Sequence, residues 1–308
     1  MKKLLLTAIA SSVIATSVSA ADLKIGVSMA LFDDNFLTTL RNGIQSAAKE
    51  QGVDVQIEDA KNGVGNQLNQ VQNFIASGVD AIIVNPVDTD ATVSISDDAQ
   101  AAGIPLIYVN RQPINVDLLP DDQAFVASDE KVSGTLQTQE VCRLLNGKGS
   151  VVVMMGELTN QAALQRTQDI HDVIATPECS GLKIVQQQTA EWSRTKGSDL
   201  MTNWIAAGIQ FDAVIANNDE MAIGAVQALK ASGRSMDDVV IAGIDATTDA
   251  LAAMKAGELD VTVFQSADGQ GRGAVNTAVK LINGQSVDRK VWVPFELVTP
   301  KNLHNYMK

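Results

Sequence analysis

The chain has 308 residues, of which 45% are hydrophobic and only 4% aromatic, and its formal net charge is −13 at pH 7. So acidic a surface repels nucleic acid and anionic lipid, which argues against partners of either class. The length exceeds that of most single cores, so we expect two lobes in an Ala-, Val- and Ile-rich α/β protein.

The first twenty residues predict an export signal. Lys2 and Lys3 precede an apolar run, and Val18-Ser-Ala20 supplies the small residues of a cleavage site. A transmembrane anchor is the alternative, but the run is short for a span and no lipidated cysteine follows it. We therefore expect a soluble periplasmic protein whose mature chain begins at Ala21 or Asp22.

Beyond the signal, short apolar runs alternate with longer amphipathic ones. The first predicted strands are Leu23–Met29, Val53–Glu58, Asp80–Asn85 and Pro105–Val109. The helices between them are Asn35–Gln51, Gln67–Ala76 and one ending near Gly103. The rhythm restarts with strand Ser150–Met155, helix Asn160–Ala175, and strands Leu182–Gln188, Ala213–Ala216 and Val239–Gly243, each followed by a helical segment. This alternation predicts βαβ units on parallel sheets.

No low-complexity linker separates the two sets of elements, so ordered crossings should join the lobes. The candidate crossings are Ala127–Glu130, Gln265–Asp268 and Ser286–Arg289. With these, residues 21–128 plus 267–288 would form the N-terminal lobe, and residues 129–266 plus 289–308 the C-terminal lobe. The cleft between two such lobes is a hinge site.

Four residues bear on covalent and metal chemistry. Cys142 and Cys179 are the only cysteines, and in an exported protein an even count favours one disulfide, with two buried thiols as the alternative. His171 and His304 are the only histidines and cannot build a metal site alone. We expect neither a metal nor a cofactor.

Two segments partly match motifs known from enzymes, but neither match is complete. Gly269–Gly273 lacks the full spacing of a dinucleotide loop and does not open the first βαβ unit, so it reads better as a helix start. Ser193–Lys196 matches a serine acyl-transfer motif, but the partner motifs of that chemistry are absent. No catalytic constellation emerges, and we expect a protein that is not an enzyme.

Polar and aromatic residues gather where predicted strands end, and in a parallel sheet those ends line one crevice. They are Phe32–Phe36, Asn110–Gln112, Glu191–Trp192, Asn217–Glu220, Asp245 and Gln265. Planar carboxylates, amides and guanidinium groups suit the hydroxyls of a polyol, and Phe36 and Trp192 could cover the apolar faces of a saturated ring. Singly, each residue could equally be a helix cap or part of the core.

At these positions the chain resembles the ribose-binding-protein family of periplasmic sugar receptors, from about Leu23 to the end. The most telling stretches are Val84–Ala91, Val109–Gln112, Asn218–Ala225 and Gly243–Asp245. The resemblance implies the type I periplasmic binding protein fold, in which two Rossmann-like lobes with parallel sheets are joined by a three-strand hinge and close on ligand.

The resemblance also implies a set of ligand-binding residues. Leu37 stands where the family has a second aromatic, and Leu164 where ribose receptors have an arginine, with Arg166 two residues on. Glu157 is a further candidate near that loop. These departures argue against ribose itself. The full expected set is Asp34, Phe36, Leu37, Asn110, Arg111, Leu164, Arg166, Trp192, Asn218, Asp245 and Gln265.

Gln165–Asp172 and Ala190–Arg194 look closer to the inositol- and rhizopine-binding branch. The expected function is therefore the periplasmic solute-binding component of an ABC-type importer, with a myo-inositol-like or hexose ligand, an inner-membrane permease as partner, and a monomeric state. The alternatives are a receptor for a rhizopine-like aminocyclitol or a ribose- or allose-type sugar, a chemoreceptor ligand carrier, and an exported enzyme. A sugar-responsive repressor would need a basic DNA-binding headpiece where the export signal stands.

Overall fold

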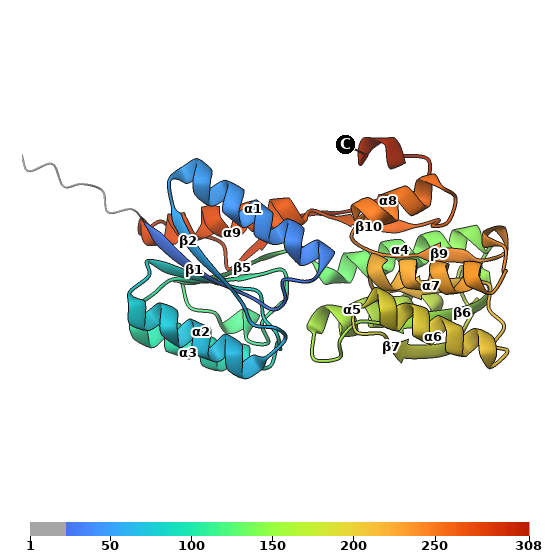
Figure 1. The fold of residues 1–308 in the computed structure, drawn as a ribbon, viewed down its shortest axis with the longest axis horizontal. Helices are drawn as coiled ribbons and strands as arrows, with labels where there is room; N and C mark the ends of the chain where they lie inside the picture. The colour runs from blue at the N-terminus through green and yellow to red at the C-terminus, as the bar shows by residue number, and fades with distance from the viewer. Residues whose placement is uncertain (1–22, 308) are drawn as a thin grey trace, which may run out of the picture.

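The structure, a computed structural model, describes residues 23–307. The export signal expected at residues 1–20 lies outside this range. Two lobes lie side by side along the longest axis of the molecule, each a sheet covered by helices (Figure 1). Within the described range, no helix combines the length and the apolarity that a membrane span requires.

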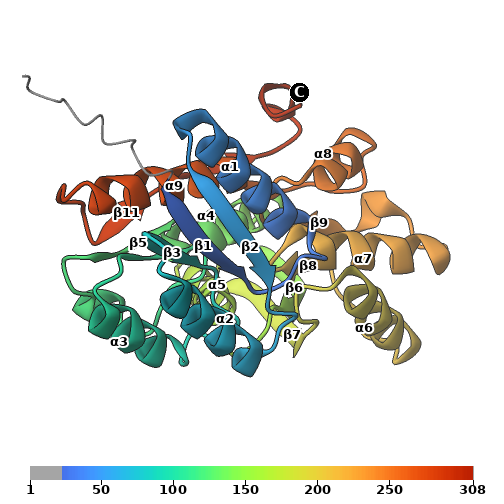
Figure 2. The ribbon, with the colours of Figure 1, turned by 60° about the vertical axis from the view of Figure 1, so that its left-hand side comes forward.

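The N-terminal lobe is a sheet with helices on both faces. Its strands are β1 (Lys24–Met29), β2 (Asp54–Asp59), β3 (Ala81–Val84), β4 (Leu106–Val109), β5 (Gln123–Ala127) and β11 (Lys290–Trp292). Its helices are α1 (Asn35–Gln51), α2 (Val64–Ser77), α3 (Thr92–Ala102) and α9 (Ala267–Ile282). The strand order is β11-β5-β4-β3-β1-β2 and every neighbouring pair is parallel. Helices α1 and α9 cover one face, and α2 and α3 the other (Figure 2).

The C-terminal lobe repeats this plan. Its strands are β6 (Lys148–Met155), β7 (Gly181–Thr189), β8 (Ala213–Ala216) and β9 (Val240–Ala242), in the parallel order β7-β6-β8-β9. Its helices are α4 (Glu130–Leu144), α5 (Gln161–Ile174), α6 (Arg194–Ala206), α7 (Asp219–Ala231) and α8 (Thr248–Lys255). An antiparallel pair, β10 (Thr262–Gln265) and β12 (Phe295–Val298), lies beside β9 through two isolated parallel bridges.

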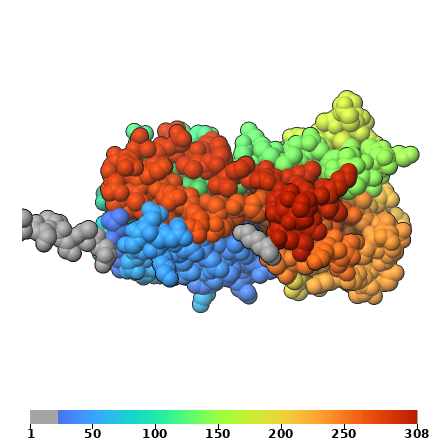
Figure 3. Space-filling model, turned by 90° about the horizontal axis from the view of Figure 1, so that it is seen from above, coloured from blue at the N-terminus to red at the C-terminus, as the bar shows by residue number. Residues whose placement is uncertain are grey.

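The chain passes between the lobes at three places: from β5 to α4, from β10 to α9, and from β11 to β12. The third crossing lies at residues 293–294, so the expected crossing near Ser286–Arg289 and the lobe boundary at residue 288 are wrong. The reason is β11, which pairs with β5 and completes the N-terminal sheet before the chain leaves that lobe. Seen from above, the end of the chain runs from one lobe onto the other (Figure 3).

Helix α1 shows how local sequence sets these elements. Asp34 caps its first turn, with Oδ1 accepting a hydrogen bond of 2.7 Å from the backbone N–H of Leu37. Gly52, with φ of 67°, ends the helix in the left-handed conformation that glycine adopts without steric cost. The strands of each sheet are parallel, so their carboxyl ends share one edge, and the expected class of two Rossmann-like lobes joined by three connections is confirmed.

Candidate functional site

A cavity lies between the lobes, where the carboxyl ends of the two sheets meet. The N-terminal lobe contributes Asp34, Phe36, Leu37, Asn110 and Arg111 to its lining. The C-terminal lobe contributes Glu130, Asn160, Ala162, Arg166, Trp192, Asn218, Asp245 and Gln265. The structure thus brings together every expected site residue except Leu164.

Leu164 is a correction to the expected site. Its side chain is 51% exposed and is absent from the cavity lining, whereas Arg166 is buried and lines the cavity. Both residues belong to α5, where a separation of two residues turns the side chain to the opposite side of the helix. Ala162 lies one turn before Arg166 and shares its face. Of the two α5 residues in the expected set, Arg166 lines the cavity and Leu164 does not.

Three lining residues were not expected: Glu130, Asn160 and Ala162. Glu130 is the first residue of α4, which follows β5, and neither element is among those predicted from the sequence. Asn160 caps α5, its Oδ1 accepting a hydrogen bond of 3.1 Å from the N–H of Ala162. If β5 is predicted, Glu130 becomes a candidate by the same rule as the other site residues, because it is a polar residue just after a strand.

The two aromatic walls come from opposite lobes. Phe36 lies in the first turn of α1, and Trp192 lies in the loop between β7 and α6. The backbone of Trp192 has φ of 62°, an uncommon value for a residue with a side chain. Its indole lies against Gly156, where an added Cβ would meet the ring at 2.1 Å, so only glycine fits beneath it. The position of the Trp192 ring thus depends on the strained backbone of Trp192 and on the absence of a side chain at Gly156.

Arg166 and Glu130 form a buried ion pair on one side of the cavity. The Arg166 guanidinium donates two hydrogen bonds to the Glu130 carboxylate, at 2.7 and 2.8 Å, and a third to the backbone oxygen of Asn217 at 2.7 Å. A longer bond of 3.4 Å reaches Oε1 of Gln265. Because most of its N–H groups are engaged, Arg166 organises the wall as well as facing the cavity.

Arg111 is the second buried cation of the lining. It donates to the backbone oxygen of Pro86 at 3.0 Å, and Glu157 lies 3.9 Å away from its guanidinium. Burial raises the pKa of Asp34, while its hydrogen bond from the Leu37 N–H and the nearby Arg111 act in the opposite direction. Glu157 itself lies outside the inner cavity, at the rim of the cleft.

Several polar groups of the cavity lining can form further hydrogen bonds. Within residues 23–307, Nε1 of Trp192 and Nε2 of Gln265 are buried donors without a hydrogen-bond partner. Burial raises the pKa of Asp245 well above its usual value, and Arg166 opposes that rise. Buried polar groups are normally paired, so these atoms mark places where a bound molecule could supply the partner.

The lobes also contact each other directly around the cavity. Asn35 donates a hydrogen bond of 2.8 Å to Glu220, and Asn62 one of 3.1 Å to Glu157. On the same rim as Glu157, the backbone N–H and hydroxyl of Thr89 both donate to the backbone oxygen of Thr159, at 3.2 and 3.0 Å. Each bond joins residues of different lobes, so this structure is the closed arrangement of the cleft.

Two α/β lobes closed over a polar cavity with aromatic walls define a solute-binding protein. The family described as "Periplasmic binding protein domain" matches residues 25–286, so the chain belongs to the periplasmic binding protein family. The sequence resemblance to that class of receptor is confirmed.

Individual relatives agree with the family. The "putative rhizopine-binding protein" of Rhizobium meliloti is 64% identical over 307 residues, which is 99% of each chain. The ribose import binding protein of Bacillus subtilis is 31% identical over 280 residues, 91% of this chain and 88% of that protein. A solute-binding protein of an ABC transporter from Bacillus halodurans, solved with bound myo-inositol, superimposes with a TM-score of 0.88 at 45% identity, covering 94% of this chain and 99% of that one.

Proposed function

We propose that this protein is the periplasmic solute-binding component of an ABC-type importer and that its ligand is a cyclitol of the myo-inositol kind. The proposal rests on the lining of the cavity, where two aromatic walls enclose carboxylate, amide and guanidinium groups from both lobes. The Bacillus halodurans relative, solved with myo-inositol, and the Rhizobium meliloti relative support a cyclitol over other polyols.

The chemistry of the ligand follows from that of the lining. Each hydroxyl of a cyclitol is both donor and acceptor, so it can accept from Gln265 Nε2 and Trp192 Nε1 and donate to Asp245. The C–H faces of the ring can lie against Phe36 and Trp192. Trp192 would thus act twice, through its ring face and through its indole N–H.

Binding of myo-inositol in preference to ribose is the first test. With Arg166 inside the cavity, Leu37 alone remains of the two departures from ribose receptors, and it reduces the stacking surface for a furanose. In a thermal-shift panel of pentoses, hexoses, inositols and aminocyclitols, a ligand at 100 times its dissociation constant should stabilise the native state by about 2.7 kcal/mol. We expect an inositol to lead the panel. Calorimetry in which ribose bound more tightly than every inositol would refute this assignment.

An aminocyclitol is the second candidate ligand, because the acidic groups outnumber the basic ones. Asp34, Glu130 and Asp245 line the cavity against two arginines, and Glu130 is already paired with one of them. The outer cleft adds Asp33, Glu157, Glu191 and Glu220, of which Glu220 is paired with Arg194 and Glu191 with Lys196. In the inner cavity Asp34 and Asp245 then stand against Arg111 alone, so a ligand ammonium group would find an excess of acidic acceptors there.

The pH dependence of binding separates the two candidates. Burial raises the pKa of Asp245, and an ammonium group favours the ionised carboxylate. Affinity for an aminocyclitol should therefore rise as the pH is raised through that pKa, whereas affinity for myo-inositol should change much less. Calorimetric titrations across the acidic to neutral range measure both. Uronic acids binding as well as aminocyclitols would argue against this view of the charge.

The remaining features of the proposal concern the cell. We infer that the signal at residues 1–20 directs export, that the mature protein is a monomer, and that it delivers unchanged ligand to an inner-membrane permease. A ligand carrier for a chemoreceptor would use the same cleft. Mass spectrometry of periplasmic protein should show a chain that begins at Ala21 or Asp22, and recovered ligand should be chemically intact.

A further inference from the structure

The loop after β9, which carries Asp245, is held in an unusual conformation. Asp245 has φ of 125° and its neighbour Ala246 has φ of 53°. Two consecutive non-glycine residues at positive φ are unfavourable, and such a conformation persists only where surrounding contacts fix it. The position of the Asp245 carboxylate in the cavity therefore depends on whatever holds this loop.

Asp219, the first residue of α7, supplies those contacts. One oxygen of its carboxylate, Oδ2, accepts from the backbone N–H of Thr247 at 2.8 Å and from the Thr247 hydroxyl at 3.3 Å. The other, Oδ1, accepts from the hydroxyl of Thr262 on β10 at 2.8 Å. That same Thr262 hydroxyl accepts from the backbone N–H of Ala246 at 3.1 Å. Asp219 thus fixes both the strained turn and the residue that follows it.

Asp219 does this without reaching the cavity. It is fully buried and absent from the cavity lining, whereas its neighbour Asn218 belongs to that lining. Gly243 makes the approach possible, because a Cβ there would lie 2.3 Å from the Asp219 carboxylate. We infer that Asp219 is a positioning residue that sets ligand affinity by holding the Asp245 loop. This inference rests on the proposed use of the cavity as the ligand site.

Asp219→Asn is the informative variant, because it keeps the shape of the side chain. An amide presents one oxygen and one NH2 group in place of the two carboxylate oxygens, so it cannot accept at both positions, one facing Thr247 and the other Thr262. Asp260→Asn is the matched control. Asp260 also accepts from a backbone N–H of β9, that of Ile241 at 2.8 Å, but it lies outside the cavity lining.

A double-mutant cycle with Asp245→Asn distinguishes positioning from general destabilisation, with calorimetric affinity for myo-inositol as the readout. Asp219→Asn should weaken binding at least about tenfold in the wild-type background, yet less than about twofold once Asp245 is replaced. Asp260→Asn should leave affinity within about twofold in either background. If Asp219→Asn does not fold, Thr262→Val, which breaks the same link to Ala246, takes its place in the cycle.

Two results would overturn the inference: unchanged affinity in Asp219→Asn, or an equal loss with and without Asp245. If the wild type does not bind myo-inositol, the proposed ligand is wrong. If the wild type binds it and Asp245→Asn leaves that binding intact, the inference fails, because the Asp245 carboxylate then does not set the affinity. If Asp245→Asn weakens binding and Asp219→Asn does not, only the positioning role is wrong.

Discussion

Replacing Asp245 by alanine should weaken binding of the best ligand by about 2–4 kcal/mol, or roughly 30- to 1000-fold. The carboxylate is buried and lines the cavity. Its removal would leave ligand hydroxyls against an apolar gap, and an unpaired buried hydroxyl loses the full benefit of its hydrogen bond. Isothermal calorimetry on wild type and variant measures the difference.

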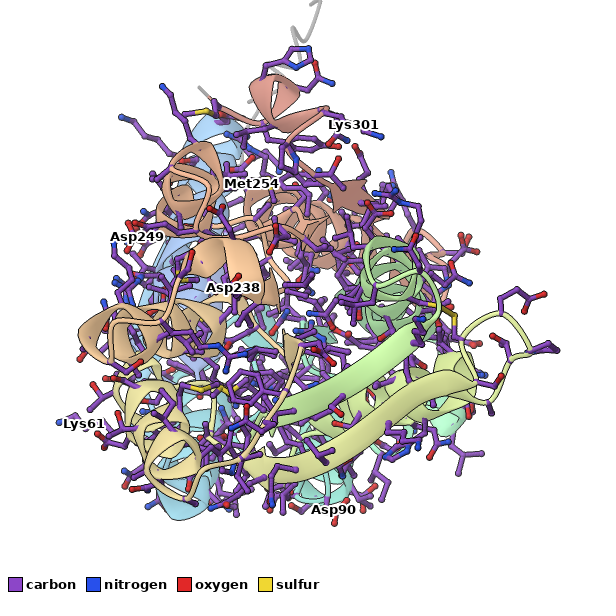
Figure 4. All side chains as sticks on the ribbon, turned by 90° about the vertical axis from the view of Figure 1, so that its right-hand side faces the viewer. Lys61, Asp90, Asp238, Asp249, Met254 and Lys301 are labelled. Carbon is purple, nitrogen blue, oxygen red and sulfur yellow. A yellow bond between two sulfur atoms is a disulfide. The ribbon has the colours of Figure 1, made fainter. Side chains whose placement is uncertain are left out.

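The control for this variant is Asp238→Ala. Asp238 belongs to the same lobe but is exposed, at the end that faces the viewer in Figure 4. It should bind like wild type. The Asp245 variant should remain folded, since a cleft residue contributes little to either core, and circular dichroism checks this. Wild-type affinity in Asp245→Ala would show that the polar residues at the strand ends serve only as helix caps.

Loss of the Cys142–Cys179 disulfide should lower the free energy of unfolding by about 3–4 kcal/mol in the chain-entropy model. The bond is present in the structure and encloses a separation of 37 residues. It joins α4 to the segment before β7 within the core of the C-terminal lobe. Denaturant unfolding of wild type and of the double variant Cys142→Ser/Cys179→Ser measures the loss.

The disulfide variant also carries an internal control. Neither cysteine lines the cavity, so ligand affinity of the folded variant should stay close to that of wild type. Periplasmic protein purified without reductant should contain no titratable thiol from these residues. Two free thiols in such a preparation would rule the bond out. The wild type and the double variant should then not differ in the loop-closure contribution to the free energy of unfolding.

The strongest periodic and capped segments could be predicted from sequence. The helix Asn35–Gln51 has both expected ends because Asp34 and Gly52 supply opposite caps. The strand Ala213–Ala216 is a short buried apolar run between polar residues and also has the expected bounds. Both elements have local signals that tertiary contacts reinforce.

Elements with polar residues at buried positions are not predicted from the sequence. Helix α4 buries Glu130, Ser133, Gln137 and Thr138, so its apolar periodicity is weak. Strand β5 begins with Gln123, which is buried because its amide donates to the backbone oxygen of Ser96 at 2.8 Å. The burial of such polar residues depends on hydrogen-bond partners that are distant in sequence. A local sequence pattern does not reveal those partners.

The site shows the same division. Residues placed by strand ends were found, because parallel strands bring their ends to one edge wherever the sheet forms. The sequence does not show which of Arg166 and Leu164 faces the cavity, because that depends on the rotation of α5 about its axis. That rotation is fixed by packing of Ala163, Ile170 and other buried residues of the helix, rather than by the loop whose resemblance guided the assignment.

The central claim is that the two lobes bind one small polyol between them. Small-angle X-ray scattering of the protein with and without saturating myo-inositol tests it most directly, because a ligand held by both lobes favours the closed arrangement. The account predicts a smaller radius of gyration on binding and a bound profile that matches the closed structure, with its Asn35–Glu220 and Thr89–Thr159 contacts. Calorimetric binding without compaction, from a free protein that does not match the closed form, would contradict it.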